Sequence, residues 1–418
     1  MSSQYVSTAS LGDAPPARSR HQGRRSVVAA TDDWIVAGLA DGDLVGFDHD
    51  LTQRWRWEAS ADSDTADPGV VAATPLGDDA VVAGERSARG AIRCHDAETG
   101  AIRWRLRAAD DVGEPQKDTR FFLPFVASLA SDGDRCYAAA RRYERTNGGD
   151  RHFESAVYAI ESDGSIAWTY ETDASPISVD VRGDRVGVTY NRCPGEHQHG
   201  LVVLDAADGS PRWMWDPGTE GQRRAGDVSL LDEGAVVASH GDYCGYRLGS
   251  GGAERWRLPL ATPADVDGET VYAYPNHVHA TGEGAVFVTG NTYPEEGRET
   301  EARHPDEHTA VGVSLDGEQR WSASVGGFAS GVGAAGSLVA VPGAQHFRDR
   351  DADAHALRLF DVERGQVAVH DIDGVAAAAA VAGDAAVAVE EPVVYHDEGT
   401  ERGAYRLHRR ETSVEFTD

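Results

Sequence analysis

The sequence predicts an all-β protein, an eight-bladed β-propeller of four-stranded antiparallel blades. Three observations support this fold class. A strand–turn–strand unit recurs along the whole chain, a second kind of hairpin turn precedes each copy, and no segment of helical length keeps an apolar period of 3.6 residues. The 47 glycines suit many tight turns, and 418 residues are enough to bury a large core in one all-β domain.

The repeated unit is clearest in residues 157–168, where two apolar strands flank a tight turn at Asp163-Gly164 and the second strand contains Trp168. Asp-Gly favours a hairpin because Gly adopts a positive φ without a steric cost. Leu51 replaces the Gly in the first unit, so that turn must differ, and Val369 replaces the Trp in the seventh. The other units occupy residues 44–55, 92–104, 202–213, 246–256, 311–321, 357–369 and 405–418.

A polar turn between two apolar strands precedes each unit and completes a blade of four strands, A to D. In the third blade we expect strands at 122–128, 135–139, 155–160 and 166–170. Four antiparallel strands repeated about every 45 residues are the signature of a propeller blade. The A–B turns lie at Asp32-Asp33, Gly77-Asp78, Gly133-Asp134, Gly183-Asp184, Glu233-Gly234, Glu283-Gly284, Gly336 and Gly383-Asp384.

Two segments compete for the outer strand of the last blade. Residues 405–418 align without a gap to the C–D unit that starts at residue 92, so we expect 413–417 to finish that blade. Residues 1–20 would then be an N-terminal arm, and 21–418 a single propeller domain. The alternative is that residues 4–9 close the ring by pairing with 404–408, because residues 5–10 resemble the D strand at 321–324.

Residues 201–213, with Asp205, Gly209 and Trp213 in fixed spacing, resemble the pyrroloquinoline-quinone (PQQ)-type, WD-like propeller repeat. The resemblance covers roughly residues 25–418 and implies eight blades, each Trp docking against a neighbouring blade. That family includes quinoprotein dehydrogenases and an outer-membrane assembly lipoprotein that only binds partners. The vicinal Cys-Cys and the calcium-ligand set of the quinone enzymes are not found, so we expect no PQQ and no other cofactor.

The chain is strongly acidic, with 69 Asp and Glu against 39 Lys and Arg and a net charge of −30. Lys117 is the only lysine. An acidic, lysine-poor surface is typical of proteins from salt-accumulating archaea, where molar salt screens self-repulsion over a Debye length of about 3 Å. We therefore expect a halophilic protein. The same charge argues against nucleic-acid binding, which needs basic patches.

The four cysteines, Cys94, Cys136, Cys193 and Cys244, form no CxxC pair, and we expect no disulfide framework. The most apolar run, residues 375–382, is too short to span a membrane. A basic loop before the first strand explains Arg24-Arg25 better than an export signal. We expect a cytoplasmic protein with no membrane span.

Function is expected on the face that carries the long B–C and D–A connections, because variable loops on a rigid scaffold are the usual place for recognition. A polar aromatic residue recurs just after strand B, with Arg or Asn nearby. These groups suit a sugar, peptide or small anionic ligand, although Tyr also caps blade edges. The candidate ligand-binding residues are Arg142, Tyr143, Tyr190, Asn191, Tyr243, Asn291 and Tyr293.

The same face is rich in histidine, so we also consider a divalent metal site. Imidazole and thiolate groups from adjacent loops are suitable ligands for a transition metal. The alternative is that these residues are solvated loop positions, because no CxxC or HExxH spacing fixes a geometry. The candidate ligands are Cys193, His197, His199, His240, His277 and His279.

No catalytic motif occurs in the sequence. The sequence therefore favours a non-catalytic propeller scaffold that binds a protein or peptide through the long-loop face. The alternative is a ligand- or metal-binding protein, or an enzyme, with a His/Tyr-lined site at the mouth of the central channel.

Overall fold

The computed structural model describes residues 6–16, 25–59, 69–297, 299–343, 354–394 and 399–412. Within these ranges the ordered elements are almost entirely β-strands. The helical segments there are the four-residue α1 (Ala109–Val112) and a 3-10 turn, η2 (Ser250–Gly252). No helix in the described ranges is long and apolar enough to cross a membrane. The all-β prediction is confirmed.

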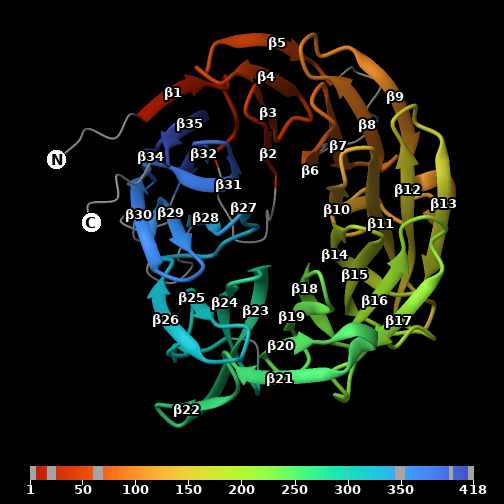
Figure 1. The fold of residues 1–418 in the computed structure, drawn as a ribbon, viewed down its shortest axis with the longest axis vertical. Helices are drawn as coiled ribbons and strands as arrows, with labels where there is room; N and C mark the ends of the chain where they lie inside the picture. The colour runs from red at the N-terminus through yellow and green to blue at the C-terminus, as the bar shows by residue number, and fades with distance from the viewer. Residues whose placement is uncertain are drawn as a thin grey trace.

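Antiparallel four-stranded units follow one another around a common centre, which makes the fold a β-propeller (Figure 1). The first strand of each unit lies nearest the centre, except in the sixth unit, where a fifth strand, β22, lies at the periphery and β23 takes the inner place. A single pair, Phe125 with Arg86, joins the second and third units into a larger sheet. These first units contain β2 (Val27–Ala30), β3 (Trp34–Gly38), β4 (Leu44–Asp48), β5 (Gln53–Trp57); β6 (Gly69–Leu76), β7 (Ala80–Arg86), β8 (Ala91–Asp96), β9 (Ile102–Arg107); β10 (Phe125–Ser131), β11 (Arg135–Arg145), β12 (Arg151–Glu161) and β13 (Ile166–Thr172).

The remaining units continue the ring, and a small hairpin of β33 (Val393–Val394) and β34 (Glu401–Arg402) leads away from the last one. The units contain β14 (Ser175–Arg182), β15 (Arg185–Arg192), β16 (Leu201–Asp205), β17 (Pro211–Trp215); β18 (Ala225–Leu230), β19 (Ala235–Ser239), β20 (Cys244–Leu248), β21 (Glu254–Pro259); β22 (Ala264–Val266), β23 (Glu269–Thr281), β24 (Gly284–Pro294), β25 (Thr309–Val313), β26 (Gln319–Ser324); β27 (Gly333–Ala335), β28 (Leu338–Gly343), β29 (Ala356–Asp361), β30 (Gly365–Asp371); β31 (Val375–Ala382), β32 (Ala385–Glu391) and β35 (Arg406–Glu411).

The outer strand of the last unit is β1 (Val6–Ser10), which pairs with β35 over five residues. The preference for residues 413–417 as the outer strand was therefore wrong, and the N-terminal alternative is the one found. Residues 413–418 themselves lie outside the described ranges. Leu11, directly after β1, is 1% exposed and donates its backbone N–H to the carbonyl of Tyr405 (2.9 Å). Burial of this side chain helps to hold β1 at the sheet edge.

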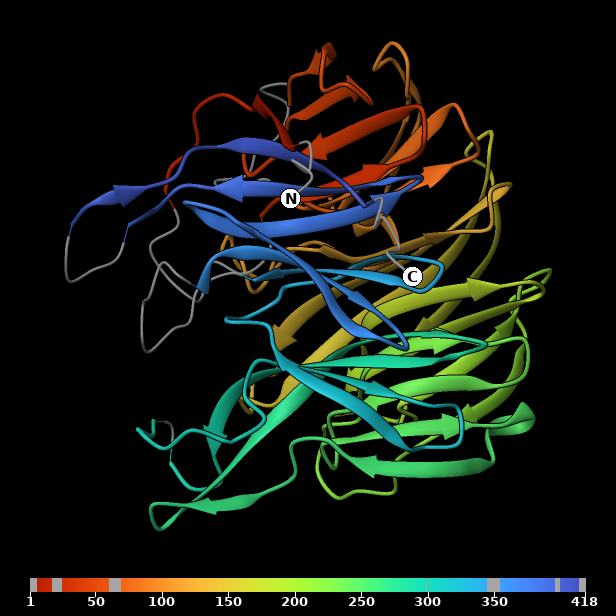
Figure 2. The same cartoon turned by 60° about the vertical axis from the view of Figure 1, so that its left-hand side comes forward.

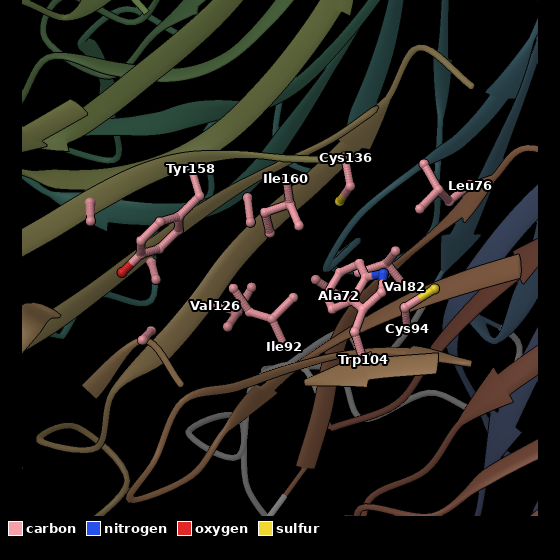
Figure 3. Close-up of a cluster of buried hydrophobic side chains, with 14 of the residues drawn as sticks. Ala72, Leu76, Val82, Ile92, Cys94, Trp104, Val126, Cys136, Tyr158 and Ile160 are labelled. Atoms are coloured by element: carbon pink, nitrogen blue, oxygen red, sulfur yellow. The ribbon is translucent and has the colours of Figure 1, made fainter. Parts of the chain in front are cut away.

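The hydrophobic core lies between neighbouring sheets rather than in one central mass. Figure 3 shows one such layer, in which Trp104 and Cys94 face Cys136 and Ile160 of the next sheet. Both cysteines are buried free thiols that pack as small apolar side chains. Each pair of sheets is thus held together mainly by burial of small and branched apolar side chains.

The tryptophans of the outer strands connect adjacent sheets, as the repeat resemblance implied. Trp104 Nε1 donates a hydrogen bond to the carbonyl of Ser162 in the next unit (3.0 Å). The same arrangement joins Trp55 to Ala97 (2.8 Å), Trp168 to Ala206 (3.0 Å), Trp256 to Leu315 (2.8 Å) and Trp321 to Val362 (3.1 Å).

The turn glycine of each unit is required by the tryptophan of the unit before it. At Gly164, φ is +88°, and a Cβ would lie 2.6 Å from Cγ of Trp104. Leu51 takes the equivalent place in the first unit, with φ +63°. The preceding outer strand is β1, which has no Trp, and the Leu51 side chain is buried in the core shared with Leu11 and Leu407. The exceptional Leu therefore fills space that a Trp fills elsewhere.

The long connections emerge on one side of the ring, as an antiparallel blade requires. Figure 2 shows the β22 end of its sheet and the β33–β34 hairpin extending to the same side. Two of the expected loops are largely strand. β11 and β12 continue to Arg145 and from Arg151, and β23 and β24 form a similarly long hairpin. We call this side the long-connection face.

Candidate functional site

The predicted ligand-binding residues of β11 are occupied by contacts within the protein. Arg142 donates from Nε to the carbonyl of Val112 (2.6 Å) and is ion-paired with Glu144. The Tyr143 ring packs against Phe122 and Phe153, with centroids 5.2 and 5.4 Å away. The charge of Arg142 is therefore neutralised, and Tyr143 supports the hairpin.

The next three predicted residues have mixed environments. Tyr190 is fully buried with its ring 4.3 Å from that of His197, and burial raises the pKa of its hydroxyl. The Asn291 Oδ1 lies 2.8 Å from His308 Nε2. Asn191 Oδ1 is buried without a hydrogen bond. Tyr190 and Asn291 thus serve packing and loop structure.

Tyr243 and Tyr293 lie together with Tyr272 and Tyr274, and we call these four residues the tyrosine cluster. The ring centroids of Tyr243 and Tyr272 are 4.5 Å apart, and those of Tyr274 and Tyr293 are 5.4 Å apart. Burial raises the pKa of Tyr243 to about 12, whereas Tyr293 is 42% exposed. The sequence signal for the two missed members is their spacing, because residues 272 and 274 point to one side of a strand.

Three of the candidate metal ligands lie in one loop but are engaged with each other and the backbone. Burial raises the pKa of the Cys193 thiol to about 12, so the thiolate that a metal requires is disfavoured at neutral pH. His197 Nε2 lies 3.0 Å from the carbonyl oxygen of His199, and burial lowers the His197 pKa. The His197 and His199 rings meet edge to face at 5.6 Å.

The other histidines do not complete a ligand set. His277 Nε2 lies 3.1 Å from the carbonyl of Ala329, and His279 Nε2 lies 2.9 Å from that of Gly336. A carbonyl partner requires these nitrogens to carry the proton, which removes their lone pairs from metal binding. Among the described residues, no group of three or more His, Cys, Asp or Glu side chains is placed to hold a metal ion. The geometry thus gives the metal hypothesis no support.

A group of arginines that the sequence did not single out lies where the inner strands β10, β14 and β18 begin. Arg141 is paired across the ladder with Phe125, the first residue of β10. Arg192 ends β15 opposite Ser175, the first residue of β14, and forms an isolated bridge with Arg223 just before β18. We call Arg141, Arg192 and Arg223 the arginine cluster.

Aromatic rings support these guanidinium groups. The Arg141 guanidinium carbon lies 5.2 and 5.4 Å from the ring centroids of Phe125 and Phe153, and that of Arg223 lies 4.9 Å from the Tyr274 centroid. Burial lowers the pKa of Arg192 to about 10, and the charges of Arg223, Arg151 and Arg141 act in the same direction. Arg141 and Arg192, each with a pKa of about 10, remain protonated at neutral pH, so positive charge accumulates at this point of an acidic protein.

His240 borders the arginine cluster. Its ring centroid is 4.8 Å from that of Tyr274, its side chain is buried, and neither ring nitrogen makes a hydrogen bond of good geometry to the protein. Burial, followed by the charge of Arg223, lowers the His240 pKa to about 3, so the ring is neutral. Gly226 allows this placement, because any Cβ there would collide with the imidazole.

A pocket of about 300 Å³ lies elsewhere, in the seam between the first and last units. It is formed near the A–B turns, on the side opposite the long-connection face. Its Arg409 is 3.2 Å from Asp384, so the charge there is already neutralised.

The comparisons with known proteins agree with the fold. The family model described as outer membrane protein assembly factor BamB matches residues 88–292, slightly under half of the chain. A search of curated protein sequences returned no match. Solved structures that resemble the chain are propellers, so the PQQ-like and WD40-like character predicted from the repeat is confirmed at the level of fold.

The structural matches cover nearly all of this chain but share little sequence identity with it. BamB from Moraxella catarrhalis is 14% identical with a TM-score of 0.54, covering 98% of this chain and 100% of its own. The quinohemoprotein alcohol dehydrogenase ADHIIG from Pseudomonas putida HK5 is 9% identical with a TM-score of 0.54, covering 95% of this chain and 77% of its own. The WD40 repeats of RRP9 are 12% identical with a TM-score of 0.51, covering 97% and 99%. Identities this low establish fold alone.

Proposed function

We propose that the protein is a non-catalytic propeller scaffold that binds a protein or peptide partner through its long-connection face. The observation that carries this proposal is the tyrosine cluster, four rings from β23, β24 and the β19–β20 turn gathered beside a projecting hairpin. Tyrosine is enriched at protein interfaces because its ring offers large apolar area at low entropic cost and its hydroxyl offers a hydrogen bond.

Other features of the same face support the proposal. Phe121 is 70% exposed in the connection between β9 and β10 and adds apolar surface to this face. The matched family model names an assembly factor, which suits a protein that binds other proteins. The candidate residues with the chemistry of a catalyst are mostly engaged in packing or backbone hydrogen bonds, which favours binding over catalysis.

The test is capture of a partner from lysate of the native host, kept at high salt, by tagged full-length protein. The double variant Tyr272→Ser/Tyr293→Ser is compared with Ile166→Ser, which removes a 43% exposed apolar side chain from β13, away from this face. We expect a partner retained by the wild type and by Ile166→Ser and lost from the tyrosine variant. An unchanged set of captured proteins would reject this surface.

We also propose that the chain forms one propeller domain of eight blades, in which residues 21–418 supply all strands except the outer strand of the last blade, which is β1. Grouping the described strands into successive units, with β1 joined to β31, β32 and β35, supports this number. Small-angle scattering of the purified chain tests it, since two separate bodies would give a clearly larger radius of gyration.

The alternative function is a ligand-binding site at the mouth of the ring. The arginine cluster favours this alternative, because it gathers positive charge at the inner rim of the long-connection face.

A further inference from the structure

We propose that Arg141, Arg192 and Arg223 form a binding site for a small polyvalent anion bearing phosphate or carboxylate groups. The site lies at the inner rim of the long-connection face. It shares Tyr274 with the tyrosine cluster, and calorimetry with an anion alone tests it without a protein partner.

Within the described residues, no carboxylate or other hydrogen-bond acceptor is paired with the guanidinium groups of the arginine cluster. None of the three forms an ion pair with a carboxylate, and none donates a side-chain hydrogen bond, within the part of the chain that the structure describes. Arg141 Nε is fully buried without an acceptor. The chain has 69 carboxylate residues available for such pairing. Leaving the buried Nε donor of Arg141 unsatisfied costs free energy, and a bound anion would supply the missing acceptor.

The neighbouring arginines show the usual alternative. Arg142 is adjacent to Arg141 and is ion-paired with Glu144. Arg224 is adjacent to Arg223, is buried, and binds Asp216 (2.6 Å) and the Gln198 side chain (2.8 Å). Carboxylates at this rim therefore form ion pairs with Arg142 and Arg224 but not with the adjacent Arg141 and Arg223.

The second argument is repulsion within the cluster. Arg192 and Arg223 face each other across a β-bridge, and the groups acting most strongly on Arg192 include three arginines and no carboxylate. Like charges this close destabilise the protein unless a counter-charge sits among them. A polyvalent anion supplies that charge, and the planar guanidinium fork suits the paired oxygens of phosphate and carboxylate groups.

The third argument is the way the groups are held. Phe125, Phe153 and Tyr274 contact the guanidinium faces, which positions the groups without using their N–H donors. The buried His240 adds an independent observation. Its ring packs against the same Tyr274. Asn276 is a polar neighbour, but within the described residues neither ring nitrogen makes a well-aligned hydrogen bond, so the ring N–H is available to an anion.

The experiment is isothermal titration calorimetry of the full chain with inorganic phosphate and, separately, with citrate, in potassium chloride at constant ionic strength. We expect saturable binding of at least one probe. The probe that binds more tightly, phosphate or citrate, identifies the preferred anionic group. Arg192→Gln and Arg223→Gln should weaken binding about tenfold or more, the loss expected for a charge-assisted hydrogen bond. Arg142→Gln, with the same change in net charge on the neighbouring strand position, should leave affinity within about twofold.

Folding and binding are separated by two further measurements. Arg192→Lys keeps the charge but loses the planar fork, so it should fold like the wild type and still bind more weakly. Without anion, Arg192→Gln should melt no lower than the wild type, because it removes repulsion. The proposal is overturned if neither probe binds saturably, if potassium chloride of equal ionic strength reproduces the effect, or if Arg142→Gln weakens binding as much as Arg192→Gln.

Discussion

Gly164 has a left-handed backbone and also lies directly against the tryptophan of the preceding sheet, so two separate constraints require glycine at this position. Gly164→Ala should lower the free energy of unfolding by roughly 2 to 3 kcal/mol, because the new methyl group collides with Trp104 in a packed interface and φ is unfavourable. The measurement is denaturant unfolding in molar salt.

Gly133→Ala is the matched control for that change. Its φ of +99° is equally unfavourable, but no atom lies within 4 Å of the added Cβ. It should cost only about 1 kcal/mol, the backbone contribution. Equal losses in the two variants would mean that contact with the tryptophan contributes nothing to stability.

Asp180 and Asp227 connect inner strands of neighbouring sheets and make stability depend on pH. The Oδ2 atoms accept hydrogen bonds from the backbone of Leu230 (2.6 Å) and Val278 (2.9 Å). Burial raises the pKa of each carboxyl group to about 6, above the value near 3.9 expected when unfolded. The folded state therefore holds protons that the unfolded state has released between these values.

The stabilisation from protonated Asp180 and Asp227 should be complete below about pH 4 and lost as the pH rises through about 6, by roughly 2 kcal/mol per group. The variant Asp227→Asn should flatten the curve of unfolding free energy against pH across this window. Asp205, whose pKa is lowered by Arg212, supplies the contrast, because Asp205→Asn leaves the slope between pH 4 and 6 in place. A wild-type curve that is already flat would contradict the assignment.

Individual site residues were the part of the structure that the sequence predicted least well. The recurrence of Tyr after strand B located Tyr243 and Tyr293. It missed Tyr272 and Tyr274, because Tyr243 meets them from the neighbouring sheet and Tyr293 meets them through the pairing of β23 with β24. Arg142 was chosen and Arg141 passed over, although adjacent strand residues face opposite ways. Arg142 pairs with Glu144, a local (i, i+2) contact, whereas Arg192, the arginine on which the charge of Arg141 acts, lies in the next blade.

At the scale of elements, the repeat predicted most strands, and the ends of the chain were the exception. Residues 5–10 and 413–417 both fit an outer strand, and outer strands carry few apolar side chains that would distinguish them. Tertiary contacts at the seam between the first and last sheets decide which segment becomes the outer strand. Leu11 and Leu51 complete the core at the seam, and Glu391 binds Arg25 (3.0 Å to Nε) and Ser26 (2.7 Å), tying the last sheet to the first.

Deletion of residues 1–12 should therefore open the ring, whereas deletion of residues 413–418 should be tolerated. The first change removes β1 and the buried Leu11 and exposes the edge of β35, which favours aggregation. We expect loss of cooperative unfolding and a larger species on gel filtration. If the C-terminal deletion is the damaging one and the N-terminal deletion is silent, the assignment of β1 as the outer strand fails.

At the scale of the whole molecule, two electrostatic effects of salt oppose each other. Repeated surface pairs, such as Arg103 with Asp79 and Asp96 (2.8 and 2.7 Å) and Arg212 with Asp184 and Asp205 (both 2.7 Å), are weakened by screening. Each exposed pair contributes only about 0 to 1 kcal/mol. Salt also weakens the mutual repulsion of the excess carboxylates, which give the chain its net charge of −30. This repulsion acts among all unpaired carboxylates together.

Because each exposed ion pair contributes little, the screening of repulsion among the carboxylates should prevail. The melting temperature should therefore rise by at least about 5 °C between about 0.1 M and 2 M potassium chloride. The variant Arg212→Gln separates the two contributions. Its loss of stability should be largest in dilute buffer and shrink as salt screens the pairs it removes, while the melting temperature of both proteins climbs. A melting temperature that stays constant or falls with salt would show that pairing, rather than repulsion, governs this acidic ring.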